Sequence, residues 1–255
     1  GGKEAGRRFI EALKLGPANV IGTQGGRDGL QKAYGAMMAL GHGRQGDVVV
    51  VSRVPWISYN WGPYGLGANV MWAPGRAEEG WAYSEDGLRA CVAETARHGR
   101  KVAGLVITSP DNPTGQTLTL ERQIALARIA LEAGVAFVLF DWMYHAVGDG
   151  EPYDANALLR AFEPELRKRL MILDGITKSL GGSNIRNCHL LADAEVVKTI
   201  VAQSSHTVIP SFFSLAVAMA AYEQGFQKAS APIAGPCRAS RAWLRDFLKA
   251  QGLTH

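Results

Sequence analysis

The sequence predicts an α/β protein with three layers, in which helices cover both faces of a mostly parallel central sheet. Short runs of β-branched and apolar residues, bounded by turn residues, alternate with longer stretches of helical periodicity. Parallel strands have this pattern because each needs a crossover connection, usually a helix, before the next strand can begin. We find no internal repeat in the chain.

Five strands and five helices account for most of the chain. Strands are expected at 48–52, 104–109, 135–140, 170–174 and 189–192, and helices at about 27–41, 85–98, 119–133, 194–204 and 211–226. Gly235 and Pro236 are expected to interrupt the chain, with a new helix after them. We therefore divide the sequence into a large domain, 1–234, and the beginning of a second domain, 235–255.

Composition narrows the class of protein. A chain of 255 residues, 47% of them hydrophobic, can bury a full core as one large domain or two small ones. The net charge of +4 is spread along the sequence, and the longest basic block is 167–169. This distribution does not indicate a nucleic-acid partner, although it suits an anionic ligand.

Cysteine usage and hydropathy indicate a cytoplasmic protein. The three cysteines, Cys91, Cys188 and Cys237, are far apart and lack metal-ligand spacing, so we expect neither disulfides nor a metal site. No apolar run reaches membrane-spanning length, and no signal peptide is evident. Because the sequence begins without Met, we expect a fragment or a processed form.

Two glycines precede the first long helical pattern. Gly25 and Gly26, followed by Arg27, leave backbone N–H groups at a helix N-terminus open to an anion such as phosphate. When the glycine pair is taken alone, an ordinary turn is the favoured interpretation. The spacing matches neither a P-loop nor the dinucleotide fingerprint.

An aromatic residue follows the strand expected at 48–52. Trp56 lies where the carboxyl ends of parallel strands build binding sites, and its ring could stack on a planar ligand. The alternative, favoured when the segment is taken alone, is that Trp56 packs the loop together with Tyr59 and Trp61.

Polar groups also follow the next two strands. The segment 109–115 contains two prolines that hold a rigid loop and present the Asn112 amide. Asp141 ends the most apolar strand of the chain, and Tyr144 follows it one turn later. A buried carboxylate is costly unless a cation or strong donor satisfies it, so Asp141 requires either a structural salt bridge or a ligand.

A lysine follows the strand at 170–174. On its own Lys178 would be a solvated loop residue, but glycines follow it, and Arg186, eight positions later, suits bidentate contact with a phosphate. Thr177 and Ser179 flank the lysine.

Three of these segments, 109–115, 141–144 and 177–186, together resemble the class I/II aminotransferases, which are fold type I pyridoxal phosphate enzymes. Residue types, order and spacing all match, and the resemblance extends from about Gly16 to Gln224. It implies pyridoxal 5′-phosphate as cofactor, bound by the large domain 1–234, with 235–255 as the start of a truncated small domain.

The resemblance assigns a role to each candidate residue. Lys178 would hold the cofactor as a Schiff base and, with Asp141 and Tyr144, form the catalytic set. Asp141 would pair with the pyridine nitrogen, Asn112 and Tyr144 would hold the phenolic oxygen, and Trp56 would stack on the ring. The phosphate would lie against Gly25, Gly26, Arg27 and Arg186, with Thr177 and Ser179 assisting.

The implied reaction moves an amino group between an L-amino acid and a 2-oxo acid, in a protein that is a homodimer at full length. One alternative is a pyridoxal phosphate lyase, for example one that cleaves a carbon–sulfur bond. A rival from another class is a non-catalytic ligand-sensing domain, as in regulators that use this fold. A third alternative is an inactive fragment, because members of the family complete each site with residues of a second subunit and we find neither their N-terminal arm nor their small-domain arginine here.

The chain departs from the family near the lysine. Gly175 stands where several members have a phosphate-binding serine, and Asn187 and Cys188 replace residues that are often small. We interpret His145 and His206 as structural.

Overall fold

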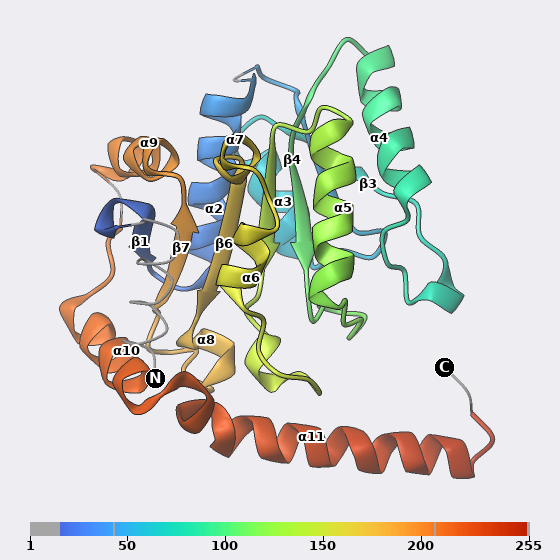
Figure 1. Cartoon of the computed structure of the whole chain (residues 1–255), viewed down its shortest axis with the longest axis vertical. Helices are drawn as coiled ribbons and strands as arrows, with labels where there is room; N and C mark the ends of the chain where they lie inside the picture. The colour runs from blue at the N-terminus through green and yellow to red at the C-terminus, as the bar shows by residue number, and fades with distance from the viewer. Residues whose placement is uncertain (1–15, 43, 207, 254–255) are drawn as a thin grey trace.

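The computed structural model describes residues 16–42, 44–206 and 208–253, and Figure 1 shows a central sheet with helices on both faces. The sheet has seven strands in the order β1-β7-β6-β5-β4-β2-β3. The strands are β1 (Val20–Thr23), β2 (Val48–Val51), β3 (Asn69–Trp72), β4 (Val102–Thr108), β5 (Phe137–Asp141), β6 (Leu170–Gly175) and β7 (Cys188–Ala192).

The pairing is mostly parallel, which confirms the predicted class. Strands β3, β2, β4, β5 and β6 run parallel to one another, whereas β7 pairs antiparallel with both β6 and β1. The five expected strands are present. The sequence did not reveal β1 and β3, because each is a four-residue edge strand without a fully buried run.

The helices that matter for the site follow the strands. Helix α2 (Gly26–Ala36) follows β1, α3 (Ile57–Tyr64) follows β2, and α8 (Ile176–Ser179) follows β6. The remaining helices are α4 (Glu85–Arg97), α5 (Leu120–Glu132), α6 (Ala155–Arg160), α7 (Pro164–Arg167), α9 (Ala194–Ser204), α10 (Phe212–Gln224) and α11 (Phe226–Ala250). All five helices expected before Gly235 are confirmed within a few residues.

The expected break at Gly235 is wrong. Helix α11, drawn in red along one end of the sheet in Figure 1, continues through this position and contains both Pro232 and Pro236. Each proline removes one N–H from the helical ladder. Because this part of α11 is largely exposed, water can bond to the carbonyls that lose their partner. The division of the chain at 234/235 therefore does not coincide with a helix boundary.

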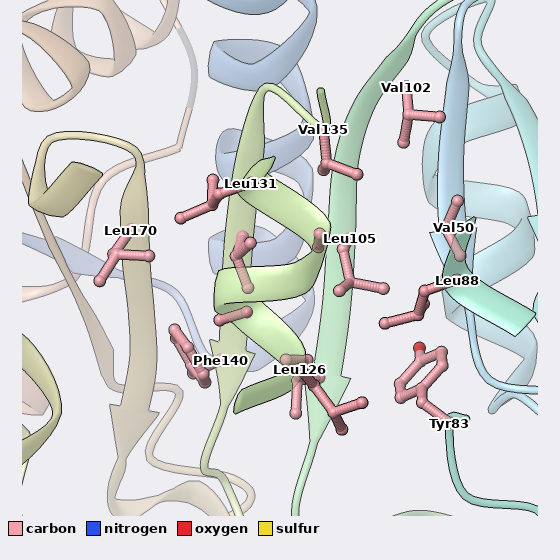
Figure 2. Packing of buried hydrophobic residues seen from close by; sticks show 14 of the residues in the cluster. Val50, Tyr83, Leu88, Val102, Leu105, Leu126, Leu131, Val135, Phe140 and Leu170 are labelled. Atoms are coloured by element: carbon pink, nitrogen blue, oxygen red, sulfur yellow. The ribbon is translucent and has the colours of Figure 1, made fainter. Parts of the chain in front are cut away.

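Alternate side chains of the strands enter two cores. Figure 2 shows part of the first, where Leu105 and Phe140 lie beside Leu126 of α5, and Val50 lies near Leu88 of α4. The second core lies on the other face, between the sheet and α2, α3 and α9. Each fully buried Val, Leu or Phe contributes about 1.5–3 kcal/mol. The strands are thus held from both sides, and their carboxyl ends form a fixed edge.

Candidate functional site

The predicted site residues gather around one cavity of about 610 Å³. It lies at the carboxyl ends of β2, β4, β5 and β6, where α2, α3 and α8 begin. Nine of the eleven predicted site residues line it: Gly26, Arg27, Trp56, Asn112, Asp141, Tyr144, Thr177, Lys178 and Arg186. Of the other two, Gly25 immediately precedes α2, and Ser179 is buried on α8 outside the cavity wall. The cavity wall also contains Leu30, Tyr59, Met143, Ser183 and Asn184.

Arg186 is held against the N-terminus of α2. Its Nη2 donates to the carbonyl of Gln24 at 3.0 Å and its Nη1 to that of Ser183 at 2.8 Å. Gly25 makes this approach possible: its φ is +82°, and a Cβ there would lie 2.3 Å from Nη2 of Arg186. A guanidinium and the free N–H groups of a helix N-terminus therefore meet at one end of the cavity, an arrangement that favours an anion.

Arg27 has its side chain elsewhere. Its guanidinium carbon lies 5.3 Å from the centroid of the Trp56 ring, a cation–π contact. Trp56 in turn meets the ring of Tyr59 edge to face, with 5.7 Å between the centroids. The indole is thus fixed on two sides, and any contact of Arg27 with an anion at the start of α2 falls to its backbone N–H.

Asp141 lies at the end of β5 and is only 3% exposed. Its Oδ1 accepts a hydrogen bond from the Met143 N–H at 3.1 Å, and its Oδ2 accepts one from the Tyr59 hydroxyl at 2.8 Å. Burial raises the pKa of Asp141 to about 6, although both hydrogen bonds act in the opposite direction. The sequence analysis expected a salt bridge or a ligand at Asp141, whereas in the structure two neutral hydrogen-bond donors of the protein contact its carboxyl group.

The raised pKa of Asp141 makes a prediction about stability. The carboxyl binds its proton more tightly in the folded chain than in the unfolded one, where its pKa is near 3.8. The bound proton therefore stabilises the fold fully below about pH 3.8, and this stabilisation is lost as the pH rises to about 6. The free energy of unfolding falls by about 3 kcal/mol over that range.

The measurement is urea unfolding of cofactor-free wild type and Asp141→Asn at pH values from 4 to 7. The wild type should lose free energy of unfolding relative to the variant across this range. A difference that stays constant with pH would show that the carboxyl has an ordinary pKa.

Asn112, Tyr144 and Lys178 face the same space. The Asn112 amide nitrogen lies 3.5 Å from the Tyr144 hydroxyl, and the Lys178 ammonium lies 5.7 Å from the centroid of the Tyr144 ring. Lys178 is exposed, whereas its neighbours Thr177 and Ser179 are buried. On the short helix α8, the lysine thus extends into the cavity while the flanking residues anchor the turn.

Hydrogen bonds account for that anchoring. The Thr177 hydroxyl donates to the carbonyl of Asn187 at 3.2 Å and lies 3.0 Å from the Cys188 thiol, and the Ser179 hydroxyl donates to the carbonyl of Met143 at 3.3 Å. The carbonyl bonds join α8 to the segments before β7 and after β5. The Thr177 hydroxyl already has partners within the protein.

His145 lies behind the site. It is 6% exposed, its Nε2 lies 3.1 Å from Oδ2 of Asp174, and its Nδ1 accepts from the backbone N–H of Tyr153 at 3.0 Å. Asp174 also accepts from the N–H of Gly175 at 2.6 Å. These contacts suit the structural role expected for His145. His206 is exposed just beyond α9.

Tyr59 is the site residue that sequence reasoning missed. The segment after Trp56 was interpreted as a loop, whereas it forms α3, which contains three aromatic residues and Pro63. The signal that could have found it is spacing, since Tyr59 lies three positions after Trp56 and hence on the same side of a helix.

Two further properties concern the described residues. Among 16–42, 44–206 and 208–253, no group of three or more His, Cys, Asp or Glu side chains is arranged to hold a metal ion. Within the same part of the chain, no helix combines the length and apolarity needed to cross a membrane.

Comparisons with known proteins agree with this geometry. Residues 4–255 match the family model described as aminotransferase class I and II. An aspartate aminotransferase of Geobacillus stearothermophilus is 24% identical over 213 residues, which cover 83% of this chain and 51% of that protein. The chain thus spans about half the length of this relative.

Solved structures show the same fold. The aspartate aminotransferase from Thermus thermophilus with maleate has a TM-score of 0.79 and 25% identity, with 99% of this chain and 63% of that chain covered. The PLP-bound C–S lyase from Staphylococcus hominis has a TM-score of 0.75 and 16% identity, with 97% and 60% covered. Enzymes of two reaction classes therefore share this architecture.

Proposed function

The chain belongs to the aminotransferase class I and II family, and from that premise we propose that it binds pyridoxal 5′-phosphate and transfers an amino group between an L-amino acid and a 2-oxo acid. The observation that supports this most directly is that one cavity is lined by Lys178, Asp141, Asn112 and Tyr144. Arg186 and the N-terminus of α2 lie at one end of the same cavity, where they favour an anion.

The residues fit the chemistry of this cofactor. An aldehyde requires an amine, which Lys178 supplies, and a pyridinium nitrogen requires a carboxylate, which Asp141 supplies from a buried position. A phosphate requires N–H donors, and the start of α2 and Arg186 supply them. The Trp56 indole lines the same cavity and would stack on the ring.

Each residue then has a defined task. When bound, pyridoxal phosphate accepts the electron pair left at the substrate Cα. Asp141 keeps the ring nitrogen protonated, and Asn112 and Tyr144 donate to the phenolic oxygen. Lys178 would hold the cofactor through its amine, and that amine would also be the group that moves a proton to and from the substrate Cα.

The names of the relatives favour transfer over elimination. Several are aspartate aminotransferases at 23–27% identity, so L-aspartate is the first amino donor to test. The second candidate is a lyase, since a C–S lyase has a similar fold. The bond that breaks at Cα depends on substrate contacts rather than on the cofactor.

A single half-reaction distinguishes these two functions. The chain is loaded with pyridoxal phosphate and mixed with L-aspartate, or with L-cysteine, in the absence of any oxo acid. Transfer predicts stoichiometric pyridoxamine phosphate and an equal amount of oxo acid from aspartate. Release of pyruvate and ammonia over many turnovers from cysteine, without pyridoxamine phosphate, would replace the proposal with the lyase.

We also propose that the full-length protein is a cytoplasmic homodimer. Residues 1–234 would form its cofactor-binding domain, and residues 235–255 would be the start of the small domain. Exposed apolar side chains before and on α10 support a partner surface there: Ile209, Phe212 and Phe213 are 71%, 87% and 68% exposed.

A further inference from the structure

We propose that Tyr59, oriented by Thr108, is a positioning residue that keeps Asp141 ionised and aimed at the cofactor. This inference rests on the proposed function, because the ring nitrogen of pyridoxal phosphate is the group toward which Asp141 would be aimed. The family resemblance gave no role to either Tyr59 or Thr108.

The three residues come from three adjacent parts of the sheet edge. Thr108 ends β4 and is paired in register with Asp141, which ends β5, while Tyr59 comes from α3. Thr108 Oγ1 donates to the Tyr59 hydroxyl oxygen at 2.8 Å, and that hydroxyl donates to Oδ2 of Asp141 at 2.8 Å. The three polar groups thus form a continuous chain of hydrogen bonds, of which Tyr59 and Asp141 line the cavity.

The direction of these bonds carries the argument. A tyrosine hydroxyl has one proton, and because Thr108 donates to its oxygen, that proton is left for Asp141. Burial, followed by the charge of Asp141, raises the pKa of Tyr59 well above its usual value, so the hydroxyl remains a donor throughout the physiological range. Tyr59 therefore stabilises the ionised form of Asp141.

The ionised form of Asp141 depends on this stabilisation because the carboxyl group is buried. Burial favours its neutral form, and a neutral carboxyl would offer a proton to the ring nitrogen where an acceptor is required. The Met143 N–H satisfies only Oδ1, so the second oxygen depends on Tyr59. The same bond fixes the rotation of the carboxylate.

A purely structural role for Tyr59 makes a different prediction. Its ring is 3% exposed and packs in the core beneath the site, and Tyr59→Phe retains that ring while removing only the oxygen. If packing were its whole contribution, neither the titration of Asp141 nor the affinity for pyridoxal phosphate would change.

The test compares wild type, Tyr59→Phe, Thr108→Val and Thr108→Ser. Carboxyl ¹³C NMR of the cofactor-free proteins follows the titration of Asp141, which is assigned with Asp141→Asn. Loss of one hydrogen bond to a charged group is expected to raise the pKa of Asp141 by about one unit in Tyr59→Phe. Thr108→Val should give a smaller rise, and Thr108→Ser should resemble wild type.

Cofactor binding is the second readout. The Kd for pyridoxal phosphate, measured at pH 7 by quenching of tryptophan fluorescence, should rise about twofold in Tyr59→Phe, because a pKa of about 7 in place of about 6 lowers the ionised fraction of Asp141 from about nine-tenths to about one-half. The matched control is Tyr64→Phe, on the same helix but 45% exposed and outside the cavity wall; it should bind as wild type does.

The outcomes separate the two proposals. If wild type binds pyridoxal phosphate and Tyr59→Phe binds it equally well with an unchanged Asp141 pKa, the role of Tyr59 is overturned and the proposed function stands. If wild type binds no pyridoxal phosphate, the proposed function fails, and the role of Tyr59 toward the cofactor fails with it. In that case a raised pKa in Tyr59→Phe would still establish the electrostatic effect on Asp141.

Discussion

Replacing Lys178 with alanine is expected to abolish covalent attachment of pyridoxal phosphate and to leave the fold unchanged. Lys178 is exposed on α8, whereas the bonds that anchor this helix come from Thr177 and Ser179. The substitution therefore removes the amine without removing the anchor. Wild type should show an absorbance band near the visible edge that borohydride eliminates, with the cofactor then fixed to the protein in the mass spectrum.

The matched control for this experiment is Lys198→Ala. Lys198 is an exposed lysine of α9 that pairs with Glu195 and lies outside the cavity. It should form the adduct as wild type does, which shows that surface lysines are not responsible. A reducible adduct of equal yield in Lys178→Ala would contradict the assignment of this lysine.

Breaking the buried pair of His145 and Asp174 is expected to destabilise the fold strongly. The side chains of His145 and Asp174 are 5% and 16% exposed. Burial raises the pKa of Asp174, but attraction to His145 and hydrogen bonds from His145 and Gly175 outweigh it and hold that pKa below its usual value. Removing one partner leaves a buried charge uncompensated, which typically costs about 3–5 kcal/mol.

His145→Phe removes the partner of Asp174 and also the acceptor of the Tyr153 N–H, so the contribution of Asp174 is read from the comparison with the double variant that adds Asp174→Asn. A phenyl ring can retain the stacking that His145 makes with Trp142 and Tyr153 while leaving Asp174 unpaired. Urea unfolding at pH 7 should show a loss near 3 kcal/mol, and adding Asp174→Asn should recover part of it.

Glu165→Gln provides the comparison on the surface. It breaks an ion pair with Lys168 in which both side chains are more than half exposed, and it should leave the free energy of unfolding close to that of wild type. If His145→Phe were equally mild, the buried pair would contribute little to the stability of the fold.

The central strands could be predicted because their sequences leave little choice. Val48–Val51 and residues 137–140 are continuous apolar runs buried on both faces. Like β4 and β6 they are strands of one parallel sheet, so the residues at their carboxyl ends lie together at one edge. The cavity residues Asn112, Asp141 and Lys178 were found for this reason. The edge strands β1 and β3 have no comparable signal, since their short runs are half exposed.

The sequence could not predict features that depend on where a side chain points in space or on what surrounds a helix. Tyr59 was placed in a loop, and nothing in its neighbours indicates that its hydroxyl reaches Asp141 from α3. Gly235 and Pro236 were expected to break the chain before a new helix, but α11 runs through both positions, and its exposure to solvent lets water replace the lost backbone bonds.

The contact between Gly175 and β7 limits how this site could be improved by engineering. A Cβ at position 175 would lie 2.5 Å from the Cα of Cys188, which is a backbone atom. Shortening the side chain at 188 would therefore not make room for serine at 175. A designer who wants tighter phosphate binding must leave position 175 alone and introduce new donors at Ser183 or Asn184, which already line the cavity.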